Sequence, residues 1–424
     1  MRFKSVDPRV VQHPVEQRGF VPVPLDYNSS SGSTIDVFYR LIPAHGSAVH
    51  DRDKPIIVVF NGGPGIAASF YRPLDYDYTT NSMPRGGLDR FKCLLQSFRV
   101  LIVDQRGTDG CSAPLDMGDP ALDAAFIAKF FSSDSHARDY RAVINALIPE
   151  GDRFFIIAQS YGGMPGMQFL ALPGRPANGI VFSSSALPFE DPIRAALARR
   201  REQLRLNLHL REVVPDIAER IKRVRAHYEA LALDPALIHG LFVLLGKDVP
   251  GTWEPAFVAR LDKILEQSRE QILEDVEAGQ EAPDLLNYIL SSVNFSPGHT
   301  DRTLAALGLR EMPFESWMID ENIMLMQTGQ DGSWRQDLIR AFDAAPPAAT
   351  LFPSLAELRA AISRNHVLFT AADNDAFVPA DNYREAIERF LVPGHTELRT
   401  LPGGHSAIFL EKGYEAFVEW SRDK

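Results

Sequence analysis

The sequence is poor in cysteine, because its 424 residues include only Cys93 and Cys111. Two cysteines cannot form a disulfide framework or a paired-cysteine zinc site, and none of the 11 histidines lies in an HExxH pair. No apolar run approaches the roughly 18 residues that span a bilayer, and residues 1–19 lack the apolar stretch of a secretory signal. We therefore expect a cytoplasmic protein without a structural metal or a membrane partner.

Positive charge is also scarce. Lysine and arginine total 44 against 55 aspartates and glutamates, which gives a net charge of −11 and an isoelectric point near 5.5. Such a chain is a poor match for the negative charge of nucleic acid or of an anionic membrane. Neither is expected as a partner.

What the sequence does contain is an ordinary globular mixture, 45% apolar and 23% charged, with several short apolar runs. Runs as apolar as PIIVVF (55–60) are typical of strands that are buried on both faces of a parallel sheet. Helical periodicity separates these runs, which is the alternation of an α/β fold. The expected strands are 55–60, 98–104, 153–158, 179–183, 366–371 and 396–401, after a hairpin of 19–26 and 34–42. The expected helices of this part are 137–148, 354–363, 380–391 and 406–422.

Residues 186–350 differ from the rest, because helical periodicity dominates them and no strand is expected there. The helices expected in this part are 191–212, 214–232, 253–276 and 316–327. We therefore predict an α/β core formed by residues 1–185 and 351–424, with a mostly parallel central sheet and helices on both faces. A helical cap of residues 186–350 would be inserted into that core.

The strongest sign of chemistry is a serine at the end of a buried strand, in the segment Ala158-Gln159-Ser160-Tyr161-Gly162. A strand that leads through G-x-S-x-G into a helix is the nucleophile elbow of α/β-hydrolases. Its turn is so tight that the positions two before and two after the serine must be small, and Ala158 adds only one methyl group to the usual glycine. A serine that merely caps a helix would be the alternative.

A serine nucleophile needs hydrogen-bond donors for the oxyanion. The strand 55–60 ends in Asn61-Gly62-Gly63-Pro64-Gly65, a loop whose amides can face a ligand. We expect the amide of Gly63 or Gly62 to be one donor and that of Tyr161, directly after the nucleophile, to be the other. An ordinary Gly-Pro turn would be the alternative.

The last two predicted strands place an acid and a base after the serine. The first of them leads into Asp373 and Asp375, and the second leads into a loop that contains His405. The order Ser160, Asp375, His405, each at the carboxyl end of a strand, is that of α/β-hydrolases. Asp373 is the competing acid. His395 is the competing base, but it precedes its strand and would lie at the wrong edge of the sheet.

Six segments together carry a family resemblance: NGGPG (61–65), FRVLIVDQRGTDGCSAP (98–114), AQSYGGM (158–164), LPGGHS (401–406), VPVPLDY (21–27) and SDSHARDYRAVINAL (133–147). They resemble the prolyl aminopeptidases, also called proline iminopeptidases, and especially the longer branch of that family. The resemblance implies an α/β-hydrolase fold with an inserted helical cap. It also implies a G-x-x-D-x-x-x-P-like pattern, which falls on Ala372, Asp375 and Pro379 and so selects Asp375 as the acid.

The resemblance further implies a cap whose carboxylates hold the free amine of the substrate. Residues 314–324 read FESWMIDENIM, where Glu321 is the match and Asp320 and Glu315 lie nearby. A carboxylate that faces an ammonium in a closed pocket is a strong anchor. Trp317 could wall a prolyl pocket. A solvated helix face is the alternative for the acids, and the cap core is the alternative for the tryptophan.

The sequence departs from the family at Asn61, Asp109, Cys111 and Ala158, which bears on the choice of substrate but not on the class of reaction. The expected activity is the removal of an N-terminal residue, preferably proline, from small peptides or amides through an acyl-enzyme, without a cofactor or metal. One alternative is another serine hydrolase, which acts on an ester, an amide or a biosynthetic intermediate with a re-purposed cap. The other is a non-catalytic binding protein that keeps the fold.

Overall fold

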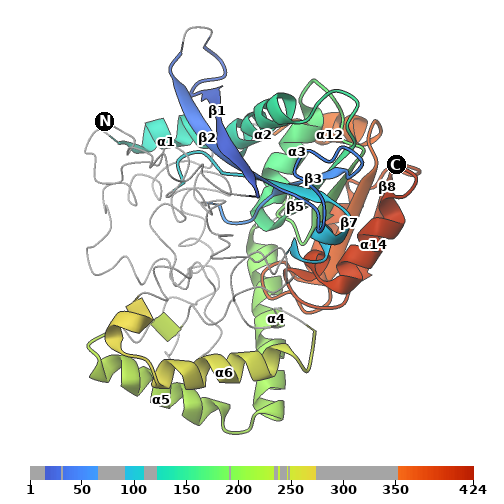
Figure 1. Cartoon of the computed structure of the whole chain (residues 1–424). Helices are drawn as coiled ribbons and strands as arrows, with labels where there is room; N and C mark the ends of the chain where they lie inside the picture. The colour runs from blue at the N-terminus through green and yellow to red at the C-terminus, as the bar shows by residue number, and fades with distance from the viewer. Residues whose placement is uncertain are drawn as a thin grey trace.

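The computed structural model describes residues 15–29, 32–64, 91–108, 122–190, 192–233, 237–238, 246, 249–273 and 352–424. In this part of the chain, eight strands form one sheet in the order β1-β2-β4-β3-β5-β6-β7-β8 (Figure 1). The pairs β1–β2 and β2–β4 are antiparallel, and all other neighbours are parallel. The strands are β1 Gln17–Pro24, β2 Thr34–Ile42, β3 Ile56–Phe60, β4 Arg99–Val103, β5 Phe154–Gln159, β6 Gly179–Ser183, β7 Val367–Ala372 and β8 Thr396–Leu401.

The expected strands are confirmed, and their sequences explain their places in the sheet. The five central parallel strands, β3 to β7, are buried at every residue, as strands covered on both faces must be. β1 lies at one edge and contains Pro22 and Pro24, which cannot donate ladder hydrogen bonds. β8 lies at the other edge and exposes Glu397, a charge that discourages pairing with another chain.

Helices cover both faces of the sheet (Figure 1). Four of them share one apolar core with the strands: α2 Ser133–Leu147, α3 Gly163–Ala171, α12 Leu355–Ile362 and α13 Ala380–Glu388. A fifth, α14 (Glu411–Ser421), packs on the opposite face in a second core.

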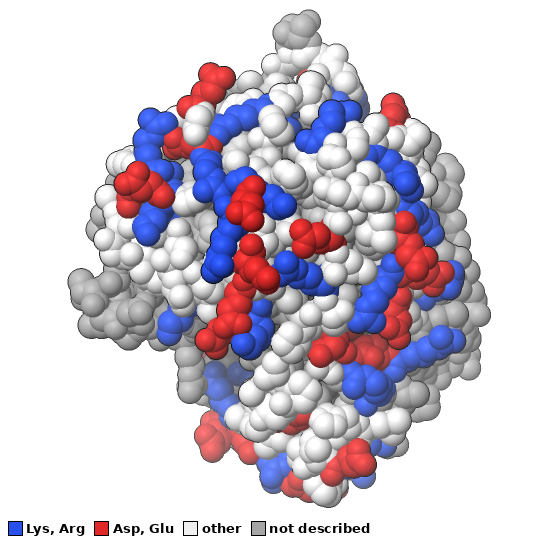
Figure 2. Space-filling view, turned by 90° about the vertical axis from the view of Figure 1, so that its right-hand side faces the viewer, with Lys and Arg blue, Asp and Glu red and all other residues white. Residues whose placement is uncertain are grey.

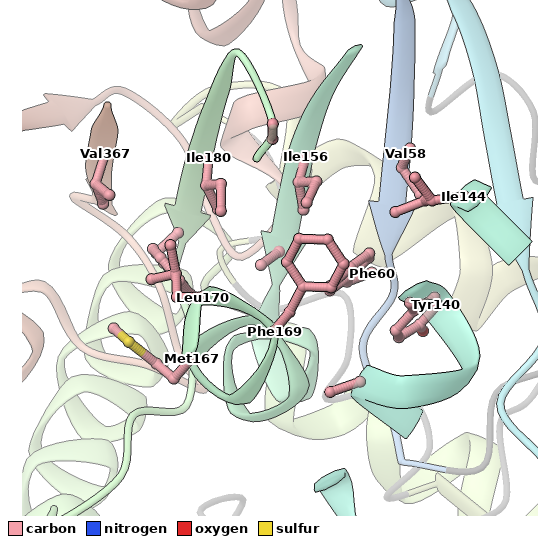
Figure 3. Packing of buried hydrophobic residues seen from close by; sticks show 14 of the residues in the cluster. Val58, Phe60, Tyr140, Ile144, Ile156, Met167, Phe169, Leu170, Ile180 and Val367 are labelled. Atoms are coloured by element: carbon pink, nitrogen blue, oxygen red, sulfur yellow. The ribbon is translucent and has the colours of Figure 1, made fainter. Parts of the chain in front are cut away.

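The larger core sits between the central strands and helices α2 and α3. Figure 3 shows Ile156 and Ile180 of neighbouring strands on the side of the sheet that faces Leu170 of α3. Phe60, the last residue of β3, stacks on Tyr140 of α2 with ring centroids 3.9 Å apart. This packing fixes α2 and α3 directly below the carboxyl ends of β3 and β5, where the candidate site begins.

Arg106 lies in the segment that follows β4 and is fully buried. Its guanidinium donates to both carboxylate oxygens of Asp139, at 2.5 and 2.7 Å, and to the carbonyls of Pro24, Leu25 and Phe130. A buried ion pair is tolerated when its remaining hydrogen bonds are satisfied in this way. Arg106 therefore links β1 and α2 to the segment that follows β4, which is a structural role.

In the described part of the chain between β6 and α12, three further helices occur: α4 Pro192–Val213, α5 Ile217–Ala230 and α6 Trp253–Leu265. Figure 1 shows α4 running away from the sheet, with α5 and α6 side by side across its far end. They enclose an apolar cluster of their own, to which Leu206, Val224 and Leu261 belong. The boundaries of the cap at 186 and 350 stay a prediction, because residues 274–351, and with them the expected helix 316–327, lie outside the described part.

Two expected helix starts are wrong. α2 begins at Ser133 rather than at 137, because its first turn is polar in sequence yet buried, so apolar periodicity does not reveal it. α14 begins at Glu411 rather than at 406, because Ala407–Phe409 form a 3₁₀ turn and Leu410 is extended.

Two further corrections concern helix caps. The expected helix 253–276 is interrupted after Leu265, where Ser268 starts a new helical segment: its Oγ accepts from the amide of Gln271, and its own amide donates to the Gln271 side chain. Helix α1 (Ala124–Phe130) was not expected, although Asp123 caps it by accepting from the amide of Phe126.

The surface carries both signs of charge. On the face shown in Figure 2, basic and acidic side chains lie interspersed, and neither sign forms one continuous patch. Among the described helices, none combines the length and the apolar character that a bilayer crossing requires.

Candidate active site

Ser160 occupies a strained turn between β5 and α3. Residues Ser160–Gly162 form a single 3₁₀ turn, and α3 begins at the next residue. The φ angle of Ser160 is 56°, in the left-handed region that a residue with a side chain rarely adopts. Such strain costs roughly 1–3 kcal/mol, persists only when the surroundings enforce it, and clusters at functional sites.

The residues around Ser160 must be small because the backbone segments almost touch. A Cβ atom on Gly162 would lie 1.9 Å from the carbonyl oxygen of Phe60, and one on Gly166 would lie 3.0 Å from the Cβ of Ala158. Ala158 therefore takes the place of the usual glycine by pointing its methyl group at Gly166 of α3, which has no side chain. The departure from the family pattern at this position is accommodated within the core.

The glycine loop after β3 lies against the serine. A Cβ atom on Gly62 would approach the Cβ of Ser160 to 2.9 Å and its Oγ to 3.3 Å. The loop is held from behind by Gln105, whose side-chain amide donates to the carbonyl of Gly62 at 2.9 Å, and by Tyr140, whose hydroxyl donates to the side chain of Asn61 at 3.3 Å. The two segments expected to supply oxyanion donors, Gly62-Gly63 and Tyr161, are thus adjacent.

Asp375 and His405 face each other at the carboxyl ends of β7 and β8. The Nδ1 atom of His405 lies 2.9 and 3.0 Å from the two carboxylate oxygens of Asp375. Asp375 is fully buried, and its Oδ1 also accepts from the amides of Phe377 and Val378 at 2.8 and 2.9 Å. The ring of Phe377 lies 4.9 Å from the imidazole, centroid to centroid, and limits its rotation. The carboxylate of Asp375 is therefore held in a fixed position.

The competing residues lie elsewhere. Asp373 accepts from the amide of Gly403 and from the side chain of Asn374, both at 2.9 Å, so it connects two loops. The carbonyl of His395 accepts from the amide of Val367 at the amino end of β7, whereas His405 follows the carboxyl end of β8.

Gln159 is a site residue that sequence reasoning missed. Its buried side-chain amide donates to the main-chain carbonyl of His405 at 2.8 Å. It therefore connects the serine turn directly to the histidine loop. The only signal in the sequence is its place immediately before Ser160, and that place alone does not show that the side chain reaches a residue 246 positions away.

A second missed residue, His136, lies beneath the elbow. Its Nδ1 is 2.8 Å from the hydroxyl of Tyr161, and both side chains are buried. Burial, and secondly the positive charge of Arg106, lowers the pKa of His136 to about 3. Burial likewise raises the pKa of Tyr161 well above its usual range. Both groups are neutral at pH 7, and together they fix the residue whose amide follows the serine.

The expected cap residues Glu321, Asp320, Glu315 and Trp317 lie outside the described residues, as do Asp109 and Cys111. Among the residues that are described, no group of three histidine, cysteine or acidic side chains could hold a metal ion.

Comparisons with known proteins identify the fold family of the chain. A family model described as the alpha/beta hydrolase fold matches residues 55–412. The chain belongs to the α/β-hydrolase fold family. The proline iminopeptidase of Aeromonas sobria is 31% identical over 159 residues, which cover 36% of this chain and 33% of that protein. This α/β-hydrolase thus spans about a third of the length of the curated relative that it matches.

Solved structures are similar to this chain at a lower sequence identity. The crystal structure of an esterase E22 mutant matches with a TM-score of 0.45 and 14% identity, covering 96% of this chain and all of that one. A bromoperoxidase from Bacillus anthracis matches with a TM-score of 0.41 and 13% identity, covering 95% and 99%. Neither likeness bears on the substrate of this α/β-hydrolase.

The two aspartates at the end of β7 give a matched pair of variants. Asp375→Asn should lower kcat by about 10⁴-fold, because an amide stabilises the wrong imidazole tautomer and cannot stabilise its charged form. Asp373→Asn keeps an oxygen that accepts from the amide of Gly403, so this variant should lower kcat by no more than about tenfold. Hydrolysis of p-nitrophenyl acetate measures both. The reverse ranking would contradict the assignment of the acid.

The lowered pKa of His136 predicts a pH dependence of stability. The unfolded chain takes up a proton near pH 6.5 but the folded chain only near pH 3, so this contribution to stability is complete above about pH 6.5. It is lost as the pH falls towards 3, at up to about 1.4 kcal/mol per pH unit. His136→Gln removes the titration and keeps a polar group beside Tyr161. Urea unfolding at about pH 7 and about pH 5 should show a smaller decrease for the variant; equal decreases would refute this account.

Proposed function

We propose that this α/β-hydrolase is a serine hydrolase in which Ser160 is the nucleophile, His405 the general base and Asp375 the acid that orients it. The observation that carries the proposal is the position of Asp375. Its buried carboxylate accepts from His405 Nδ1, which leaves Nε2 as the nitrogen that can take the proton of Ser160. The strained serine beside Gly62 supports the same roles.

The reaction would proceed through an acyl-enzyme. His405 Nε2 takes the hydroxyl proton as Ser160 Oγ attacks the carbonyl carbon, and then donates this proton to the departing amine or alcohol. A water molecule, deprotonated by His405, releases the acyl group in the second half. The amides of Gly63 (or Gly62) and Tyr161 would hold the oxyanion, and each donor contributes roughly 10²–10³ in rate.

For the substrate, we propose an N-terminal residue, preferably proline, of a small peptide or amide. This finer proposal rests on the segments that resemble prolyl aminopeptidases and on the partial match to the proline iminopeptidase of Aeromonas sobria. Glu321, with Asp320 and Glu315 as the next candidates, would pair with the free ammonium of the substrate, since burying that charge unpaired is costly.

The substrate proposal predicts a preference for a free amine. The ratio of kcat/KM for a prolyl arylamide over its N-acetylated form should be roughly ten to more than a hundred, the worth of a charge-assisted hydrogen bond. Glu321→Gln keeps the shape of the side chain and removes its charge, so it should abolish most of this ratio. The same variant should leave hydrolysis of p-nitrophenyl acetate nearly unchanged, because that ester carries no ammonium.

Each other outcome points to a different conclusion. Equal rates for the free and acetylated substrates would contradict the aminopeptidase proposal and favour an ester or amide hydrolase with a re-purposed cap. A preference that survives Glu321→Gln would transfer the anchor to Asp320 or Glu315. Hydrolysis that survives Ser160→Ala above about a thousandth of the wild-type rate would contradict the nucleophile itself.

A further inference from the structure

We propose that Arg205 of α4 and Asn374 are positioning residues, which connect the helices α4, α5 and α6 to the loops that carry Asp375 and His405. The inference rests on the proposed function, because those two loops matter for catalysis only if their residues act on Ser160. The catalytic roles themselves do not require such a connection. The reason to infer one is that Asn374, the residue before Asp375, is hydrogen-bonded to α4.

Polar contacts run from α4 through Asn374 into the histidine loop. The guanidinium of Arg205 donates to Asn374 Oδ1 at 2.8 Å. The other side-chain atom of Asn374, Nδ2, donates to Asp373, which in turn accepts from the amide of Gly403. The main-chain amide of Asn374 donates to the carbonyl of Gly403 at 3.0 Å. Asn374 therefore joins α4 to both loops, through its side chain on one side and its main-chain amide on the other.

Apolar contacts follow the same route. Ala376, the residue after Asp375, belongs to the buried cluster of α4, α5 and α6 rather than to either core of the sheet. Phe377 packs against that cluster and also lies 4.9 Å from the imidazole of His405. The two residues after Asp375 are thus packed against α4, α5 and α6, and the residue before it is hydrogen-bonded to α4, although Asp375 itself follows a strand of the sheet.

The direction of the Arg205 side chain is also fixed. Glu202, one turn earlier on α4, accepts from its guanidinium at 2.5 and 2.9 Å, a fork-like pairing that orients the remaining donor toward Asn374. Gly246, with a φ of 61°, packs against the main chain of Asn374: a Cβ atom on this glycine would lie 2.3 Å from the carbonyl oxygen of Asn374. A shift of α4 relative to the sheet would therefore move the segment that holds the acid.

A second arginine on the same helix supplies the control. Arg194 binds Glu385 of α13 through two hydrogen bonds of 2.5 and 2.6 Å, so it also joins α4 to the core. Its side chain is 60% exposed and that of Arg205 is 51% exposed, so the two are comparable in solvation. They differ in what they hold, because Arg194 contacts a helix and Arg205 contacts the loop of the acid.

The test compares Arg205→Met with Arg194→Met on p-nitrophenyl acetate, an ester too small to need the cap. Arg205→Met should lower kcat by about three- to tenfold, the effect of one partly exposed hydrogen bond. Its KM should stay within about twofold of wild type, and Arg205→Lys should restore part of the loss. Arg194→Met should keep the wild-type kcat. Thermal unfolding of both variants checks that neither change unfolds the chain.

A double-mutant cycle with Asn374→Leu makes the test specific to the pair. If Arg205 acts through Asn374, the double variant should be no slower than Asn374→Leu alone. Equal losses in Arg205→Met and Arg194→Met, or losses of Arg205→Met and Asn374→Leu that multiply in full, would overturn the inference. Loss of ester hydrolysis in Ser160→Ala but not in Arg205→Met would overturn only the inference. A wild type without Ser160-dependent hydrolysis would overturn the proposed function and this inference together.

Discussion

Ser160 holds a φ of 56°, and this one strained residue dictates how closely the neighbouring segments must approach. The turn brings the start of α3 to within contact of β3, which is why Gly162 has no room for a side chain and why Gly62 lies against the serine. Strain of this kind persists only where the surroundings over-determine the backbone. Here the stacking of Phe60 on Tyr140, the fully buried β5 and the core of α3 supply that constraint.

The site has two parts, the buried pair beneath the serine turn and the aspartate that faces His405. Beneath the serine turn, burial keeps His136 and Tyr161 uncharged, and the charge of the nearby Arg106 is paired with that of Asp139. At the carboxyl end of β7, the fully buried Asp375 accepts hydrogen bonds from His405 Nδ1 and from the amides of Phe377 and Val378. Gln159 joins the two parts, because it precedes the serine and holds the carbonyl of His405.

The sequence alone was sufficient to predict the strands of the sheet and the pairing of Asp375 with His405. Among the described strands, the apolar runs revealed the buried ones, β3 to β7, because a sheet covered on both faces requires such runs. A hairpin turn revealed β1 and β2, the alternation of helix and strand revealed β8, and the order along the chain placed Asp375 beside His405. It was not sufficient for helix starts such as Ser133, whose polar first turn is buried, or for contacts such as Gln159–His405 and Arg205–Asn374. Those contacts join residues far apart in the chain by single side-chain hydrogen bonds, and no spacing rule predicts which side chain will reach across. Glu321 and the other expected cap acids stay predictions.

The most direct test of the central claim, that His405 activates Ser160 as a nucleophile, is the site of covalent modification by a fluorophosphonate. The reagent reacts with a serine only where a base and an oxyanion site activate it. Peptide mapping by mass spectrometry should place one adduct per chain on Ser160, and His405→Ala should suppress that adduct while leaving the fold intact. An unmodified protein, or an adduct on a different residue, would contradict the account.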